Sequence, residues 1–212
     1  MYDNSVASVV NIKNYQDGRL VGRGTGFFLE PGDKIVTNDH VIDSADHLIV
    51  ETYWRRQIKI DKVLARDDWA DLAILPVPAS FHPDSLALAD RSHSLGERVF
   101  AIGFPRATRF GISEGTIVQL GDLMSRKRGQ VQVDLSSGPG GSGSPLLDVD
   151  GNVVGVIRGG DSTSKMFTFA VHQNEIRRLL TQDLQPKNIS EGYYQPGEAW
   201  DALVELFERA FK

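Results

Sequence analysis

The chain has 212 residues, of which 41% are hydrophobic and 24% charged, a composition typical of a globular protein with one large or two small domains. Its formal net charge of −5 provides no basic surplus for nucleic-acid binding, and no apolar run reaches the roughly 18 residues of a transmembrane helix. The absence of cysteine excludes disulfides and thiolate metal sites, so the stability of the fold must come from its core.

The first part of the chain alternates short apolar segments with turns. Six segments rich in β-branched and aromatic residues recur about every ten residues, which predicts a small antiparallel barrel over residues 1–80. They are residues 6–12, 24–29, 34–37, 47–52, 57–65 and 72–77. Residues 81–97 lose this rhythm, and we interpret them as a linker.

A second series of strands follows the linker and predicts another barrel over residues 98–184, which ends in a helix at 173–180. The expected strands are residues 98–104, 111–118, 130–134, 144–148, 152–157 and 166–171. The predicted fold is therefore all-β, with two six-stranded antiparallel barrels. Residues 185–212 are predicted to form a connector and an amphipathic helix at 198–211, which either docks on the barrels or begins a further unit.

The segment 138–145 is a glycine-dense turn in which Ser142 has glycine on both sides. Glycines permit left-handed backbone angles and close approach of a ligand, as an exposed nucleophile requires. No Lys-Ser or Lys-Thr pair closes the turn and no helix pattern follows it, so a phosphate loop is not indicated.

Two residues of the first half can activate this serine. His40 lies just beyond a predicted strand, and Asp71 stands at the head of the strand that begins at Leu72. A serine hydroxyl needs a base such as imidazole to accept its proton, and the imidazole needs a carboxylate to orient it. We therefore predict a catalytic site made of His40, Asp71 and Ser142.

Several motifs in this order resemble the trypsin-like serine peptidases, and within them the HtrA/DegP-like branch, over residues 6–180. The matching segments are Gly24-Thr25-Gly26-Phe27, Thr37-Asn38-Asp39-His40-Val41, Asp71-Leu72-Ala73-Ile74-Leu75, Ala101-Ile102-Gly103-Phe104-Pro105 and Gly140-Gly141-Ser142-Gly143-Ser144-Pro145-Leu146. The resemblance implies a chymotrypsin-like double barrel and a serine endopeptidase without cofactor. It assigns His40 as general base, Asp71 as its orienting carboxylate and Ser142 as nucleophile.

The same resemblance implies an oxyanion hole at Gly140, Gly141 and Ser142, formed by the main-chain N–H groups of Gly140 and Ser142. The family usually has Asn before the serine and Gly-Gly after it, whereas this chain has Gly141 before it and Gly143-Ser144 after it. Gly141 gives the loop greater backbone freedom than Asn would. One alternative is therefore that the oxyanion hole forms only when substrate or a partner orders the loop.

The substrate pocket is also inferred from the resemblance. Ser136 would lie at its base, and Ile157 and Gly160 at its wall and mouth, which favours a small or medium apolar residue before the cut. The strand from Arg158 to Gly160 would pair with the substrate backbone. Arg158 stands where relatives have a small polar residue. We expect the Arg158 side chain to point to solvent. In the alternative, its guanidinium pairs with Asp71 and weakens the interaction of Asp71 with His40.

Two alternatives to a protease remain open: a pseudo-protease that binds peptides as a scaffold, and a chaperone-like module that holds unfolded chains. The expected partners are protein or peptide substrates, without nucleic acid, membrane or metal. The helix at 198–211 resembles the start of a helical adaptor found beside peptidase modules in bacterial effector systems, so an effector or adaptor partner is a further possibility. No secretory signal is visible at Met1-Tyr2-Asp3-Asn4, which predicts a cytoplasmic protein, or a periplasmic one if an upstream segment was removed.

Overall fold

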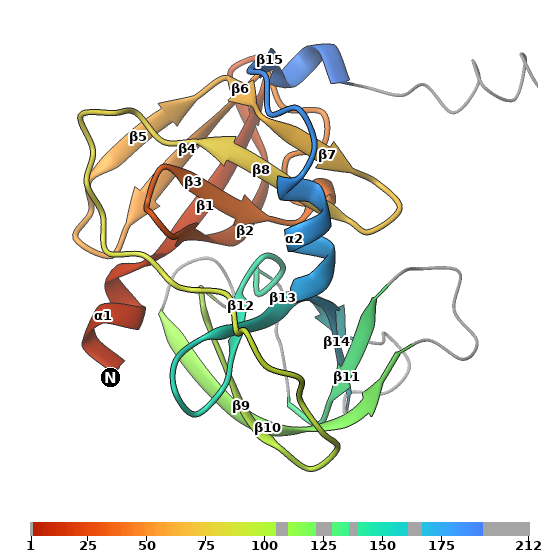
Figure 1. Ribbon diagram of the computed structural model, residues 1–212. Coiled ribbons are helices and arrows are strands. Elements are labelled where there is room, and N and C mark those ends of the chain that lie inside the picture. The colour runs from red at the N-terminus through yellow and green to blue at the C-terminus, as the bar shows by residue number, and fades with distance from the viewer. Residues whose placement is uncertain (1, 105–109, 122–128, 136–139, 161–166, 193–212) are drawn as a thin grey trace, which may run out of the picture.

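The computed structural model of the chain describes residues 2–104, 110–121, 129–135, 140–160 and 167–192 (Figure 1). Its first half contains α1 (Tyr2–Ala7), β1 (Val9–Gln16), β2 (Arg19–Leu29), β3 (Lys34–Thr37), η1 (Asp39–Val41), β4 (His47–Thr52), β5 (Gln57–Ile60), β6 (Lys62–Val63), β7 (Ala65–Asp67) and β8 (Leu72–Pro76). Its second half contains β9 (Arg98–Gly103), β10 (Gly111–Leu120), β11 (Gln130–Val133), β12 (Pro145–Leu147), β13 (Val153–Gly160), β14 (Thr168–His172), α2 (Gln173–Leu180), β15 (Lys187–Asn188) and η3 (Ile189–Gly192).

The first half is one antiparallel sheet of seven strands, in the order β5-β4-β1-β2-β3-β8-β7, which curls into a half-barrel. It differs from the six strands expected because residues 57–65 divide into β5, β6 and the start of β7. The break falls at Asp61, whose carbonyl accepts the N–H of Ile189, while β6 leaves the large sheet and pairs with β15.

The expected strand at 6–12 begins later than predicted. Residues as far as Ala7 form α1, and pairing of β1 with β2 starts at Val9 opposite Phe27. Ser8 ends the ladder, since its carbonyl accepts the N–H of Phe28. Val6, the one β-branched residue of the expected strand before Val9, therefore has no strand partner and lies in the helix α1.

The second half confirms the prediction of a six-stranded barrel. It is closed, in the order β10-β11-β14-β13-β12-β9. The linker runs from one half to the other, seen in yellow to green in Figure 1, and it touches a strand of each. Leu86 bridges to Leu29 of β2, and Leu88 bridges to Val153 of β13.

The two halves share a hydrophobic core. One cluster joins Val9, Phe27 and Leu72 of the first half to Ile102 and Val156 of the second. The helix α2, expected at 173–180 and confirmed there, adds Ile176 and Leu179 to this cluster. This shared core stabilises the relative position of the halves, and with it any site formed between them.

Within the described ranges, no helix combines the length and the apolar character needed to cross a bilayer. The amphipathic helix expected at 198–211 lies outside the described residues.

Candidate active site

His40 lies in η1, a single helical turn that begins where β3 ends. Asn38, the residue before the turn, has an extended backbone (φ −80°, ψ 151°), so the chain bends sharply between strand and turn. Thr37 anchors the bend, because its hydroxyl donates to the carbonyl of Thr25 at 2.7 Å. The side chain of His40 is 49% exposed, which leaves one edge of the ring accessible to a substrate.

Asp71 precedes β8 and faces His40 from a strained backbone. Its φ of 61° lies in the left-handed region, which costs about 1–3 kcal/mol for a residue other than glycine. The side-chain amide of Asn38 donates to the Asp71 carbonyl at 2.9 Å and helps to hold this conformation. The Asp71 carboxylate accepts the main-chain N–H of His40 at 3.0 Å, and both its oxygens lie 2.9 Å from His40 Nδ1. This contact orients the imidazole so that Nε2 can act as the proton acceptor.

Ser142 lies at the surface of a turn that two left-handed glycines shape. Gly140 has a φ of 89° and Gly143 a φ of 87°, which side chains rarely permit. The N–H of Ser144 donates to the carbonyl of Gly141 at 3.0 Å and closes the turn around the serine.

Thr25 of β2 joins the first half to this turn, a role that sequence reasoning missed. Its N–H donates to the Ser142 carbonyl at 2.8 Å, and its hydroxyl donates to the Gly140 carbonyl at 2.8 Å. The same hydroxyl accepts the N–H of Phe104 at 3.1 Å. A Cβ on Gly143 would lie 1.8 Å from the Thr25 carbonyl oxygen, so only glycine fits there. The glycines on either side of Thr25 were the available signal, since they mark a strand that another backbone approaches closely.

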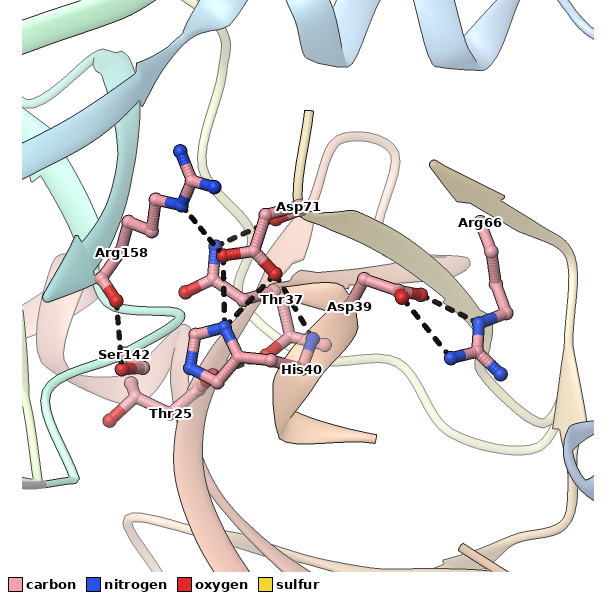
Figure 2. A network of polar contacts seen from close by, with 9 residues as sticks. Thr25, Thr37, Asp39, His40, Arg66, Asp71, Ser142 and Arg158 are labelled. Carbon is pink, nitrogen blue, oxygen red and sulfur yellow. Dashed lines mark hydrogen bonds and ion pairs between the residues drawn. The ribbon is translucent and has the colours of Figure 1, made fainter. Parts of the chain in front are cut away.

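The structure brings the three predicted catalytic side chains into one network (Figure 2). The imidazole of His40 lies between the carboxylate of Asp71 and the hydroxyl of Ser142. That hydroxyl donates to the main-chain carbonyl of Arg158 at 3.1 Å.

The expectation that Arg158 points to solvent is wrong. Its side chain is 14% exposed, and Nε donates to Oδ2 of Asp71 at 3.0 Å (Figure 2). A charge-assisted hydrogen bond of this length is stronger than a neutral one, and the nearly buried carboxylate provides the acceptor. Arg158 thus contacts both ends of the network, with its guanidinium on Asp71 and its carbonyl on Ser142.

A second ion pair supports the turn that carries His40. Arg66 of β7 donates through Nε to Oδ1 of Asp39 at 2.6 Å. Burial raises the pKa of the Asp39 carboxyl above its usual range, against the opposing effect of Arg66. This pair ties η1 to the outermost strand of the first sheet.

The residues predicted to bind substrate lie on or near β13. Ile157 is fully buried and packs in the core of the second barrel, and its carbonyl accepts the N–H of Gly143 at 2.8 Å. Gly160 pairs with Thr168 of β14 at the end of the strand. Ser136 lies outside the described residues.

Three other histidines make local contacts. His47 stacks on Tyr15 with ring centroids 5.3 Å apart, and His172 caps α2. Nε2 of the buried His93 lies 3.5 Å from Oδ2 of Asp148. In the segments that the structure describes, no group of three or more histidine, aspartate, glutamate or cysteine residues is arranged to hold a metal ion.

Two known bacterial proteins with similar sequences are named as serine proteases. The chain is 32% identical over 135 residues to the probable periplasmic serine endoprotease DegP-like of Pseudomonas savastanoi pv. phaseolicola, covering 63% of this chain and 28% of that protein. It is 30% identical over 214 residues to the serine protease Do-like HtrB of Bacillus subtilis, covering 87% of this chain and 46% of the relative. It therefore spans less than half the length of either.

Among solved structures, the chain is similar to the active form of the Rv3671c protease from M. tuberculosis. The TM-score is 0.77 at 26% identity, over 87% of this chain and 85% of the other. This likeness and the two relatives confirm the resemblance to trypsin-like and HtrA-type protease domains.

The family model of the trypsin-like peptidase domain matches residues 24–156. That range includes His40, Asp71 and Ser142, and it covers more than half of the chain. The chain therefore belongs to the trypsin-like peptidase domain family.

Proposed function

We propose that this chain is a serine endopeptidase in which Ser142, His40 and Asp71 form the catalytic triad. The observation that carries the proposal is the position of the His40 ring, held by both oxygens of Asp71 at 2.9 Å and adjacent to the Ser142 hydroxyl (Figure 2). Trypsin-like and HtrA-type relatives, whose names describe them as serine proteases, support it.

In the proposed reaction, the Ser142 hydroxyl turns from the Arg158 carbonyl to Nε2 of His40. Nε2 takes the hydroxyl proton while Oγ forms a bond to the scissile carbonyl carbon. The tetrahedral intermediate then breaks its C–N bond, and His40 gives the proton to the leaving amine. Water repeats the sequence on the acyl-enzyme and restores the free serine.

The negative oxygen of the intermediate would be stabilised by the main-chain N–H groups of Gly140 and Ser142. Two such donors are worth several kcal/mol in a site shielded from water, about 3–4 kcal/mol each. The left-handed Gly140 and the bonds from Thr25 to Gly140 and Ser142 support a preformed turn.

Substrate residues before the cut would pair with β13 beside Ser142. In the described residues, β14 pairs with β13 as far as Gly160, whereas β12 pairs with it only at Val153–Val156. The end of β13 therefore has an edge to which a peptide can add as another strand. A small or medium apolar residue before the cut remains our proposal from the sequence.

The cellular location follows only from relatives. Several are named periplasmic endoproteases, which favours the periplasmic alternative over the cytoplasmic one for this chain. An effector or adaptor partner remains a proposal from the sequence.

A fluorophosphonate probe tests the proposed triad, because it phosphonylates only an activated serine. We expect wild-type protein to gain one label on Ser142, and Ser142→Ala and His40→Ala to gain none. Ser80→Ala, which removes an exposed serine just before the linker, should label like wild type. Absence of label in folded wild-type protein, with and without peptide, would reject the proposal.

A pseudo-protease is the second candidate, and one observation favours it. Arg158 binds the carboxylate of Asp71 and the hydroxyl of Ser142 at the same time, so the resting network is not yet aligned for attack. Peptide binding by a folded protein that does not label would support this alternative.

A further inference from the structure

A hollow of about 260 Å³ lies on the face of the first sheet that also packs against the second barrel through Val9 and Phe27. Asn11 and Lys13 of β1, Arg23 of β2 and Glu51 of β4 form its floor. Lys13 pairs with Arg23 across the β1–β2 ladder, and Asn11 pairs with Glu51 across the β1–β4 ladder. Because alternate residues share a face of a sheet, these four side chains point to the same side.

Aromatic rings form one wall of the hollow. Tyr53, Phe104 and Phe110 come from three different segments, with ring centroids 5.5 Å apart for Tyr53 and Phe110 and 5.7 Å for Phe104 and Phe110. Trp54 packs edge-on against Tyr53 at 5.0 Å and is 71% exposed, while Tyr53 is 41% exposed. An exposed aromatic cluster beside charged residues is typical of a binding surface.

The floor carries a positive excess on an otherwise acidic chain. Lys13, Arg23 and Arg55 line the hollow together with a single carboxylate, Glu51, whereas the whole chain has a net charge of −5. Lys13 and Arg55 each contact Glu51 at 2.8 Å. Arg23 lies beyond this cluster on the exposed half of β2, where its guanidinium can meet an anionic ligand.

Strand β2 connects the hollow, which it lines with Arg23, to the catalytic turn, which it contacts through Thr25. Thr25, two residues after Arg23 and on the same face of the sheet, donates to the carbonyls of Gly140 and Ser142. Two residues of a strand span about 7 Å, so Arg23 at the edge of the hollow lies about that far along β2 from the residue that holds the catalytic turn. Thr25 lies on the side of Ser142 opposite Arg158 and the edge of β13 (Figure 2).

We propose that this hollow binds the part of the protein substrate that follows the scissile bond, and that it selects an acidic residue next to a large apolar or aromatic one. The inference rests on the proposed function, in which residues before the cut pair with β13. A peptide that leaves β13 and passes Ser142 then runs along β2 toward the exposed Arg23. The aromatic wall accepts the apolar residue, and the excess of two positive charges accepts the carboxylate.

Binding to the inactive Ser142→Ala protein tests the proposal directly. The probe is a fluorescein-labelled octapeptide with two aspartates, one glutamate and a phenylalanine between them, and the control replaces the three acids with lysine. We expect the acidic peptide to bind at least tenfold more tightly by fluorescence anisotropy, with an advantage that falls as salt rises.

Two substitutions and their matched controls locate the site. Arg23→Glu and Tyr53→Ala should each weaken binding of the acidic peptide about fivefold or more. Arg19→Glu changes an exposed arginine of the same strand outside the hollow, and Trp69→Ala removes an exposed aromatic residue elsewhere, so both should bind like the parent. Equal affinity for the two peptides, binding of neither, or equal losses in Arg19→Glu and Arg23→Glu would overturn the proposal.

The outcome is separable from that of the proposed function. The fluorophosphonate probe reacts at Ser142 without entering the hollow, so labelling of the wild-type chain reports on the triad and peptide binding to Ser142→Ala reports on the hollow. Selective peptide binding without labelling would reject the triad and retain the hollow as a peptide site. Labelling without selective peptide binding would retain the triad and reject the hollow as a peptide site.

Discussion

Replacing Arg158 with glutamine should make the proposed protease faster. During attack, His40 becomes a positive imidazolium that Asp71 must stabilise. In this chain, the guanidinium of Arg158 shares the same carboxylate oxygen, at 3.0 Å from Nε, while His40 Nδ1 lies 2.9 Å from it. The two positive groups therefore approach within about 6 Å of each other, and their repulsion opposes the charge that forms on the ring.

The magnitude follows from these distances. Two unit charges about 6 Å apart repel by roughly 3 kcal/mol at an effective dielectric constant of about 20. The side chain of His40 is 49% exposed, and solvent screening reduces the repulsion to about 1.4 kcal/mol. Because that free energy corresponds to a factor of about ten in rate, Arg158→Gln should raise kcat/KM about tenfold.

Loss of the ion pair should not unfold the site. Asp71 keeps its contacts with the main-chain N–H and with Nδ1 of His40, and Asn38 still donates to the Asp71 carbonyl. Nη2 of Arg158 is buried without a hydrogen-bond partner within the part of the chain that the structure describes, so part of the cost of burying the guanidinium is also removed.

Cleavage of a quenched peptide by Arg158→Gln and by Arg158→Lys provides the assay, with thermal unfolding of both as a check on folding. The lysine variant keeps the positive charge and should stay within about threefold of wild type. The reasoning would be refuted if folded Arg158→Gln lost activity, or if both variants changed activity by the same factor, because charge would then not be the cause.

Two further predictions concern stability. The pKa of Glu51 is lowered from 4.5 to about 2, mainly by a hydrogen bond from Lys13 that outweighs the effect of burial. The ionised Glu51 carboxylate therefore stabilises the fold fully above about pH 4.5, and this stabilisation is lost as pH falls toward 2. Glu51→Gln should lower the free energy of unfolding by about 2 kcal/mol at pH 7 and by little at pH 2.5, as measured by urea titration; an equal loss at both values would contradict this. Gly143→Ala places a Cβ 1.8 Å from the Thr25 carbonyl oxygen. It should lower the free energy of unfolding by more than about 3 kcal/mol and abolish fluorophosphonate labelling. Gly18→Ala, at a similar φ of 71° with no atom within 4 Å of the new Cβ, should cost only about 1 kcal/mol and keep the label, and similar losses in both would show that contact with Thr25 is unimportant.

The fold was largely predictable because its signals are local. Alternation of apolar residues and turns predicted the strands of the second barrel, and helical spacing predicted α2 from Gln173 to Leu180. One error, at the start of the first strand, arose because residues as far as Ala7 form a local helix, and another arose where a distant segment competes with local preference. The stretch 57–65 divides because Asp61 and β6 contact residues near 188, more than a hundred residues later.

The sequence by itself determined the types and order of the groups proposed for catalysis: a histidine after a strand, an aspartate before one, and a serine between glycines. Such groups can be recognised because their chemistry demands particular side chains. Only the tertiary structure decided that Arg158 contacts Asp71, 87 residues away, and that Thr25 contacts Gly140, 115 residues away. Both contacts depend on how the first sheet packs against the second barrel, and no pattern within either segment encodes that packing.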